Sequence, residues 1–374
     1  MRLLLTLLFA FSLPLHTRVD PVQQRVPLQI GPEETLAATA TLTDPSGSSR
    51  IVVWNTARVA HLLAPPVGLD PGELSAGLEL GGFDGAGTIY ATLVKSMELE
   101  AGGNETVPGL YPHNAFAPLY LKPCDAVTSP DFLPHIEHVA ADAIYLTYES
   151  PDSTEVLDGD QTSDLAPYAV RLQGGACTLL GRASIRDVNG AFAVGFRGYL
   201  GQYIAPTDLD PDRQRYVAVR IHAGSLTELG PGVAMAVAQD GTAVGADAPP
   251  IHESETESAN GSTETFSCCT PHAMLWHPDG TSVALAPAAR SSIAYAIENA
   301  GHAHIAGGML VDANGIHRAF LWIDGNLYLL DDVVHAAGWR FESVFAFGPH
   351  HQVFGVGTHN GTAAVFEVSA VTGS

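Results

Sequence analysis

The strongest constraint on the fold is an internal repeat with a period of 46 to 55 residues. Four clear copies lie between residues 168 and 330. Each begins with a short apolar segment, a turn that contains glycine, and a second apolar segment, which is the signature of a β-hairpin. The equivalent positions in the first segments are Leu172, Ile221, Trp276 and Trp322, which lie 49, 55 and 46 residues apart.

A second element follows each hairpin and consists of an apolar strand, a polar turn, another apolar strand and a glycine. The four elements end at Gly195, Gly245, Gly307 and Gly355, so that one unit holds about four strands. Four strands in roughly 40 to 50 residues is the spacing of propeller blades. Helical repeats of similar length would place apolar residues at i, i+3, i+4 and i+7, and these segments do not.

Fainter copies precede the clear ones. Residues 38–54 read as a strand, a turn and a strand that ends in Trp54, residues 81–91 resemble the turn and last strand of a unit, and a further copy spans about 114–148. After the last unit, residues 361–368 form one more strand, which can close a ring by completing the first blade.

The repeat therefore predicts an all-β protein, a β-propeller of about six to seven four-stranded blades. Clear repeats occupy residues 168–370, whereas the N-terminal blades, over residues 35–165, are degenerate. We expect one propeller domain over residues 18–374. The 38 glycines and 25 prolines among 374 residues agree with many short strands joined by turns.

The charge of the chain limits its partners. Only 15% of the residues are charged, yet the formal net charge is −23. This charge repels phosphate backbones and anionic lipid headgroups, which excludes binding of nucleic acid or a membrane surface through a basic face. We expect a neutral or cationic ligand, such as a carbohydrate or a protein, and a monomeric chain.

The N-terminus resembles a secretory signal peptide. Arg2 precedes an apolar run that is too short for a transmembrane helix. The sequence thus predicts a signal peptide over residues 1–17, a secreted or periplasmic protein, and a mature chain without a membrane span. The four cysteines, Cys124, Cys177, Cys268 and Cys269, suit an oxidising compartment but show no metal-binding spacing. Their pairing, or the absence of any pairing, is open.

The closing repeat resembles that of the extracellular HAF-repeat proteins, which are named for a His-Ala-Phe tripeptide. The resemblance is carried by residues 318–322, which read Arg-Ala-Phe-Leu-Trp, and by Gln352-Val-Phe-Gly355. It extends over about 168–370. The tripeptide survives as His272-Ala-Met and Arg318-Ala-Phe, but the usual Asn-x-x-Gly turn has become Gly348-Pro-His-His351. The resemblance implies a secreted, propeller-like repeat protein and no established reaction.

Two acidic loops are candidates for calcium, because a hard cation needs several converging oxygens. Their residues are Asp158, Asp160, Asp164, Asp208, Asp210 and Asp212. A plain solvated loop is the reading that the sequence favours for both, with calcium as the alternative, and no other cofactor is indicated. The sequence contains no GxSxG elbow, HExxH helix or Walker A loop.

The recurring tryptophans, Trp54, Trp276 and Trp322, are expected in the core between blades, whereas Trp339 lies outside the repeat register and is the candidate for ligand binding. His302 and His304 alternate along a strand and are expected to form a surface pair. The acidic, Ser/Thr-rich insert at residues 252–265 is expected to be a mobile loop.

The sequence favours a secreted binding or structural module without enzymatic activity. The alternative is a hydrolase or lyase that acts on a polysaccharide or related substrate at the propeller channel. An enzyme predicts inward-pointing carboxylates or histidines with shifted pKa values clustered at the channel. A binding module predicts exposed aromatic side chains and no such cluster.

Overall fold

The computed structural model describes most of the chain. The described residues are 5–12, 17–19, 28–42, 48–66, 77–97, 103–112, 115–119, 134–140, 143–148, 154–157, 160–163, 168–197, 216–248, 254–257, 263–266, 270–300 and 303–370. They form strands almost throughout, with a 3₁₀ turn, η1 (Pro32–Glu34), and a short helix, α1 (Leu330–Val333). None of the helical segments among them is long and apolar enough to cross a membrane.

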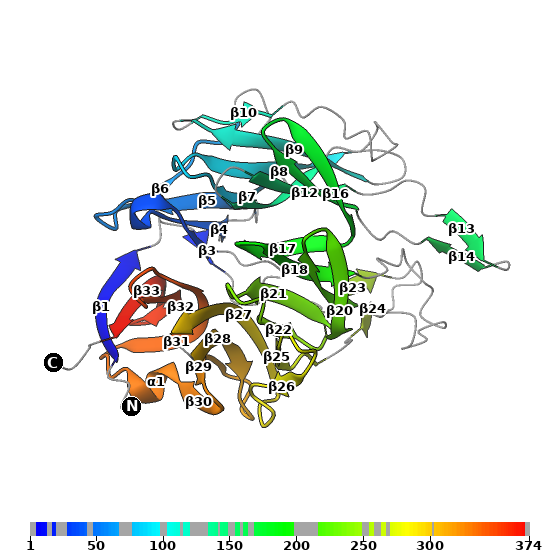
Figure 1. Cartoon of the computed structure of the whole chain (residues 1–374). Helices are drawn as coiled ribbons and strands as arrows, with labels where there is room; N and C mark the ends of the chain where they lie inside the picture. The colour runs from blue at the N-terminus through cyan, green and yellow to red at the C-terminus, as the bar shows by residue number, and fades with distance from the viewer. Residues whose placement is uncertain are drawn as a thin grey trace.

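The described strands form seven blades, which follow one another round a ring (Figure 1). Blade 1 holds β2 (Thr17–Arg18), β3 (Leu28–Ile30), β4 (Leu36–Leu42), β5 (Ser49–Trp54) and β6 (Ala60–Leu62); blade 2 holds β7 (Gly77–Phe83), β8 (Ile89–Met97), β9 (Gly103–Tyr111) and β10 (Ala117–Pro118). Blade 3 holds β11 (His135–Ala140), β12 (Ala143–Tyr148), β15 (Tyr168–Gln173) and β16 (Ala176–Arg182); blade 4 holds β17 (Ser184–Asn189), β18 (Phe192–Arg197), β19 (Val217–His222) and β20 (Ser225–Pro231). Blade 5 holds β21 (Val233–Val237), β22 (Ala243–Ala246), β25 (Ala273–Trp276) and β26 (Ser282–Ala284); blade 6 holds β27 (Ser291–Ala300), β28 (Ala303–Val311), β29 (His317–Ile323) and β30 (Asn326–Leu329); blade 7 holds β31 (Trp339–Phe347), β32 (Val353–His359), β33 (Thr362–Ala370) and β1 (Leu5–Ser12). The predicted fold class is confirmed.

We call the innermost strand of each blade its first strand. The first strands are β3, β7, β11, β17, β21, β27 and β31. Those of blades 2 and 3 touch through one parallel pair, Gly82 and Val139. In blade 1, β2 and β3 pair with opposite ends of β4 and share the innermost position.

Tight turns join the outer two strands of several blades. Asp324 and Gly325 between β29 and β30 both have positive φ, at 45° and 87°. Such a turn matches the right-handed twist of the flanking strands, and it explains why an Asp-Gly pair marks this hairpin in the sequence. Ala223-Gly224 makes the same turn between β19 and β20, and Asn360-Gly361 makes it between β32 and β33, the second and third strands of blade 7, with the same sign of φ.

Blade 7 is completed by a strand from the other end of the chain. Residues 5–12 pair antiparallel with β33, from Leu5 opposite Ala370 to Ser12 opposite Ala364. The prediction that residues 361–368 complete the first blade is wrong, because this segment is β33 and pairs with β32 of its own blade. β1 lies within the predicted signal peptide, residues 1–17, and export stays a prediction.

The predicted repeat unit straddles two blades. Its hairpin is the outer half of one blade, such as β29 and β30, and its second element is the inner half of the next, β31 and β32. The recurring tryptophans, Trp54, Trp276 and Trp322, keep only 0%, 2% and 8% of their surface exposed. They lie in hydrophobic clusters that span neighbouring blades, which confirms their predicted place in the core.

The glycine that ends each second element sits opposite a kink in the first strand. A Cβ atom added at Gly195, Gly245, Gly308 or Gly355 would lie 1.8 to 2.0 Å from a carbonyl oxygen of the first strand of the same blade. Because the obstacle is backbone, it cannot move aside as the end of a side chain would. In blade 6 the glycine in contact is thus Gly308 rather than Gly307.

This contact gives a matched pair of substitutions in one hairpin of blade 4. Gly195→Ala should lower the free energy of unfolding by about 3 kcal/mol, because its Cβ would meet the carbonyl oxygen of Ser184 at 1.8 Å. Gly190→Ala in the turn faces open space and carries only the strain of a positive φ of 59°, about 1 kcal/mol. Urea unfolding of both variants checks the difference, and equal losses would contradict it.

Two further hairpins leave the ring between second and third strands. β13 (Thr154–Leu157) pairs with β14 (Asp160–Ser163), and β23 (Ser254–Glu257) pairs with β24 (Thr263–Phe266). The described part of the insert at residues 252–265 thus forms a hairpin, and its mobility stays a prediction. Acidic residues alternate there with Ser and Thr, and the β-branched threonines favour an extended backbone.

Candidate functional site

A β-bulge recurs in the first strands and aims side chains at the centre of the ring. It interrupts the register of six of the seven blades at equivalent places. The extra residues are Gly81, Glu137, Arg186, Met235, Tyr295 and Phe345. A bulge bends its strand and redirects the side chains beside it, so these residues and their successors set the chemistry of the channel.

The first strands of all seven blades enclose a cavity of about 280 Å³. Most of its lining is apolar, with aromatic rings from Phe83, Tyr295, Phe345 and Phe347. One side differs: His138 from β11 and the adjacent Arg186 and Asp187 from β17 all line it. We call these three residues the polar wall. The cavity thus offers one charged side, and the remaining lining is mainly apolar and aromatic residues together with the polar Gln29 of β3.

His138 and Asp187 face each other across the junction of blades 3 and 4. The Nε2 atom of His138 lies 3.9 Å from Oδ1 of Asp187, and Oδ2 of Asp187 accepts the N–H of Val237 at 2.8 Å. Burial lowers the pKa of His138, although the charge of Asp187 opposes this. Burial raises the pKa of Asp187, opposed by His138 and by the N–H groups of Val237 and Val188. His138 is therefore neutral at neutral pH and able to accept a proton.

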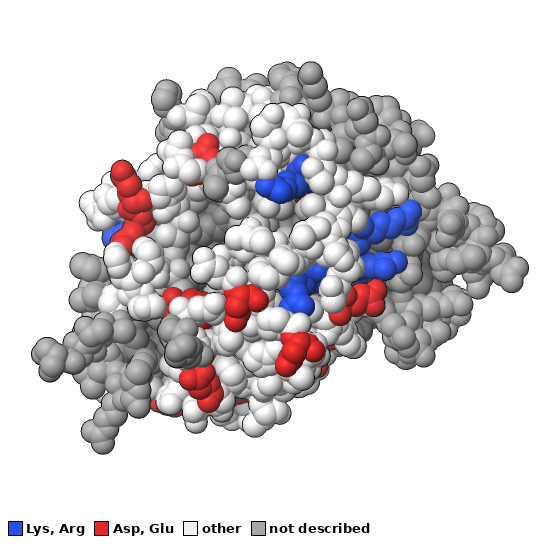
Figure 2. All heavy atoms as spheres, in the orientation of Figure 1, with Lys and Arg blue, Asp and Glu red and all other residues white. Residues whose placement is uncertain are grey.

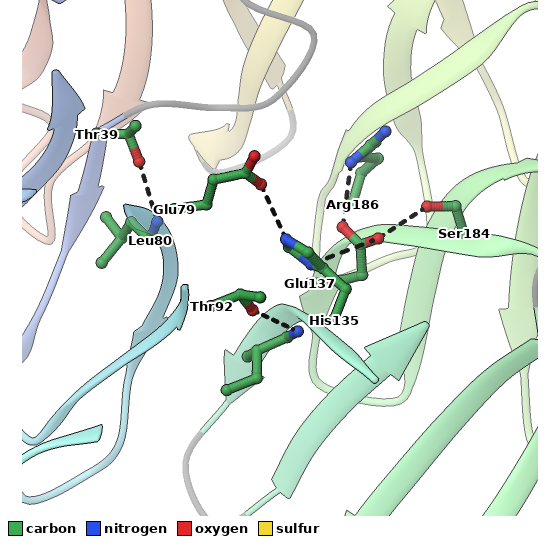
Figure 3. A network of polar contacts seen from close by, with 9 residues as sticks. Thr39, Glu79, Leu80, Thr92, His135, Glu137, Ser184 and Arg186 are labelled. Carbon is green, nitrogen blue, oxygen red and sulfur yellow. Dashed lines mark hydrogen bonds and ion pairs between the residues drawn. The ribbon is translucent and has the colours of Figure 1, made fainter. Parts of the chain in front are cut away.

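Arg186 is held by a buried carboxylate (Figure 3). Its Nη1 atom lies 3.1 Å from Oε2 of Glu137, and the two side chains are 9% and 4% exposed. The guanidinium also lies over the ring of Phe196, 4.9 Å from its centroid. A cation fixed by a buried partner and an aromatic face keeps one orientation, which suits it to meet a particular group of a ligand.

Further polar contacts fix Glu137. Ser184 Oγ donates to Oε1 of Glu137 at 3.2 Å, and Nδ1 of His135 lies 3.9 Å from the same oxygen. His135 in turn contacts Oε2 of Glu79 through Nε2 at 2.8 Å. As Figure 3 shows, these side chains come from the first strands of blades 2, 3 and 4 and converge on Glu137. The network therefore joins three blades and includes Arg186 of the polar wall.

Arginines concentrate on the two blades that carry the polar wall. Blades 3 and 4 contribute Arg171, Arg182, Arg186, Arg197 and Arg220. On the face drawn in Figure 2, most of the Lys and Arg atoms lie over this region, whereas Asp and Glu gather mainly over other blades. The negative net charge is thus unevenly distributed.

Trp339 lies away from the cavity. It is half-buried in blade 7, where its ring stacks on Phe341 at 5.5 Å and on His359 at 5.0 Å between centroids. A ligand role for Trp339 stays a prediction. His304 contacts Asp240 with 2.8 Å between Nε2 and Oδ2, whereas His302 lies outside the described residues.

The predicted calcium ligands cannot be placed. Asp158, Asp164, Asp208, Asp210 and Asp212 lie outside the described residues, as does the side chain of Asp160, whose backbone begins β14. Within the described part of the chain, no group of three or more His, Cys, Asp and Glu side chains is arranged to hold a metal ion. Cys177 is disulfide-bonded, and the other three cysteines lie outside the described residues.

The comparisons with known proteins identify a fold and no family. No protein-family model matches the sequence, and no curated protein does. An ulvan lyase of a polysaccharide lyase family, bound to -[GlcA(1-4)Rha3S]-, matches at 9% identity with a TM-score of 0.50 over 96% of this chain and 95% of its own. A prolyl endopeptidase matches at 8% identity with a TM-score of 0.51, and the alignment covers 96% of this chain and 51% of that protein. The β-propeller domain of the trilobed protease from Pyrococcus furiosus matches at 10% identity with a TM-score of 0.47 over 98% of this chain and 99% of that domain. At these identities the likeness extends to the propeller fold alone.

Proposed function

We propose that the channel cavity is the active site of a carbohydrate lyase that cleaves an acidic sugar chain by proton abstraction. The observation that carries the proposal is the polar wall: a half-buried neutral histidine, an aspartate that faces it and a fixed arginine, all lining one cavity. This favours the enzyme over the binding module preferred from the sequence, because histidine and carboxylate with shifted pKa values cluster at the channel.

His138 is the base in this proposal. Its Nε2 atom faces Asp187, which orients the ring and stabilises the imidazolium that forms, so Nδ1 takes the proton. The proton comes from the carbon next to the carboxylate of a uronate residue. Arg186 faces that carboxylate and stabilises the negative charge that develops on it. The electrons of the broken C–H bond form a C=C bond, and the glycosidic C–O bond at the neighbouring carbon breaks.

Tyr295 returns a proton to the leaving oxygen. It is the one described lining residue with a hydroxyl group. The rings of Phe83, Phe345 and Phe347 offer apolar surfaces on which the C–H face of a sugar packs.

Hydrolysis fits the cavity less well than elimination. Glycoside hydrolysis ordinarily uses two carboxyl groups on either side of the scissile bond. Among the described residues that line the cavity, Asp187 carries the only carboxylate. Elimination needs one base and one cation, and both are present.

An acidic substrate departs from the neutral or cationic partner that the net charge predicts. With His138 neutral, the charges of Glu137, Arg186 and Asp187 leave the site with one net negative charge. The substrate carboxylate is therefore held by direct contact with Arg186 and not by a positive field. Long-range repulsion from the rest of the chain is screened beyond about 8 Å at physiological salt.

We also propose that the chain acts outside the cytoplasm, as the HAF-repeat proteins that it resembles do. The disulfide at Cys177 supports an oxidising compartment. Cleavage of a signal peptide over residues 1–17 would remove β1 and leave blade 7 with β31, β32 and β33.

Incubation of the purified chain with uronate-containing and matched neutral oligosaccharides tests the function. We expect new ultraviolet absorbance from the conjugated double bond with the acidic substrates only, and a rate about 10²- to 10⁴-fold lower in His138→Gln. New reducing ends without absorbance would indicate a hydrolase. Binding without turnover would restore the binding module favoured by the sequence.

A further inference from the structure

The cavity has no side entrance among the described strands. Neighbouring first strands contact one another from β7 through β11, β17, β21 and β27 to β31, and β31 contacts β3. Between blades 1 and 2, β4 and β5 contact β7. A ligand therefore reaches the polar wall only through a mouth of the channel, along the axis of the ring.

The polar wall lies below the rim of the channel. His138 is two residues before Ala140, the last residue of β11, and Asp187 is two residues before Asn189, the last residue of β17. At about 3.3 Å per residue, both Cα atoms lie about 7 Å inside the nearer strand ends. A sugar residue that meets them must have left the surface of the protein.

The cavity has room for one sugar residue. Its 280 Å³ lies just below the range of roughly 300 to 1,000 Å³ that is typical of pockets for drug-sized ligands, so it suits a ligand of about one ring. An internal residue of a polysaccharide would bring two neighbours with it, one on either side. To place it in the cavity, both neighbours would have to fold into one mouth, or the chain would have to be threaded through the ring from one of its ends. A terminal residue brings one neighbour, which extends outward along the channel axis.

Resting on the proposed lyase function, we propose that the protein acts on the reducing end of its substrate and releases one unsaturated sugar at a time. Elimination removes a proton from one ring carbon and breaks the C–O bond of the neighbouring ring carbon. The sugar residue in the cavity must therefore carry the rest of the chain on the glycosidic oxygen of that neighbouring carbon. A uronate at the non-reducing end has no chain at this position. A uronate at the reducing end does, and its own anomeric end is free.

The reaction then balances at the chain end. His138 takes the proton, a C=C bond forms within the terminal residue, and the shortened chain leaves with the glycosidic oxygen and the proton from Tyr295. The products are an unsaturated monosaccharide in the cavity and a chain with a new reducing end outside it. The shortened chain can enter again in the same orientation.

Two tagged forms of one acidic oligosaccharide test the direction of entry, by binding as well as by turnover. A bulky fluorophore on the reducing end should weaken binding at least 100-fold, and the same fluorophore on the non-reducing end should leave the Kd within a few-fold, as measured by calorimetry. Calorimetry with His138→Gln excludes turnover. Equal binding of both tagged forms, or no binding of the untagged oligosaccharide, would overturn the inference.

Product sizes provide the second measurement. At early times we expect unsaturated monosaccharide and long chains, whereas unsaturated fragments of intermediate size would overturn the inference. Ultraviolet absorbance in fragments of intermediate size would contradict cleavage at the chain end and would still support the lyase function. Failure of the inference is therefore distinguishable from failure of the proposed function. Ala296→Leu, which fills the cavity, should abolish binding, and Ala284→Leu on the exposed strand β26 is the matched control.

Discussion

Replacing Arg58 by alanine should lower the free energy of unfolding by about 3 to 5 kcal/mol. Arg58 lies in the turn between β5 and β6 of blade 1 and reaches across to blade 7. Its Nη2 atom lies 3.1 Å from Oε2 of Glu367 and 3.5 Å from Oε2 of Glu34, and its guanidinium lies over the ring of Phe354. The first and last blades of the ring are thus joined by one arginine.

The cost is large because Glu367 is buried. Its side chain is 8% exposed, and without Arg58 a carboxylate would remain in the interior without the cation that faces it. Burial raises the pKa of Glu367, whereas Arg58 lowers it. In the variant the pKa of Glu367 in the folded chain rises further above its value in the unfolded chain. Folding is then coupled to protonation of Glu367 over a wider range of pH.

The pH dependence identifies the cause. A group with a raised pKa in the folded chain favours folding below its ordinary pKa, and this contribution disappears as the pH rises through the folded pKa. The deficit of Arg58→Ala should therefore be smallest in mild acid, where Glu367 is protonated, and largest near neutral pH. Urea unfolding over this range measures it.

The control is an arginine of similar chemistry on the surface. Arg197 lies 3.5 Å from Glu228, but the side chains are 43% and 57% exposed. Arg197→Ala should cost less than about 1 kcal/mol, because exposed ion pairs are solvated and screened. Equal losses for the two variants, or a deficit of Arg58→Ala that is independent of pH, would contradict the role of Glu367.

The ring and its core could be predicted from the sequence because both depend on local, repeated features. A buried residue such as Trp276 or Trp322 recurs at one place in a hairpin, and the apolar alternation around it requires no knowledge of distant contacts. The closure of the ring was not predictable in the same way. Residues 5–12 form an apolar run near the N-terminus that the sequence marks as an export signal, and nothing local in this run indicates its pairing with β33.

The polar wall could not be predicted from the sequence, because its residues replace apolar ones at a bulge position that only the structure reveals. Blades 5, 6 and 7 place Met235-Ala236, Tyr295-Ala296 and Phe345-Ala346 at the bulge, whereas blades 3 and 4 place Glu137-His138 and Arg186-Asp187 there. Alignment of the first strands of these five blades shows that charged residues replace apolar ones at the bulge in blades 3 and 4.

Blade 3 could not be aligned from the sequence because it lacks the glycine of the other copies. Ile136 faces Leu146 across its hairpin, where Ile185 of blade 4 faces Gly195. Without that marker, its first strand does not read as a copy of the repeat. Burial at the centre of the ring shifts the pKa values of His138 and Asp187, and this burial depends on all seven blades together.

Asp187→Asn should lower kcat on the acidic substrate about 10²- to 10⁴-fold, the range in which a positioned proton-transfer group acts. The amide keeps the size of the side chain and can still accept the N–H of Val237. It loses the charge that orients His138 and stabilises the imidazolium in the transition state. The expected loss is therefore in kcat, with KM changed little, since Arg186 holds the substrate carboxylate.

The pH profile separates this role from a structural one. His138 must be neutral to act as the base, so kcat/KM falls on the acid side, with an apparent pKa below the ordinary value of histidine because burial lowers it. Asp187 raises the pKa of His138, so its loss should move this limb to still lower pH while the maximum rate falls. A weaker base that is neutral over a wider range of pH is the expected signature.

Asp331→Asn is the matched control, because Asp331 is 23% exposed, close to the 26% of Asp187, and accepts the N–H of Phe341 in blade 7, away from the cavity. It should leave kcat and the acid limb unchanged. A rate loss shared by both variants would show that the effect is one of folding. An acid limb that stays in place in Asp187→Asn would show that His138 is not the base. Loss of the Asp187 charge must lower the pKa of His138, so a limb that reports His138 has to move.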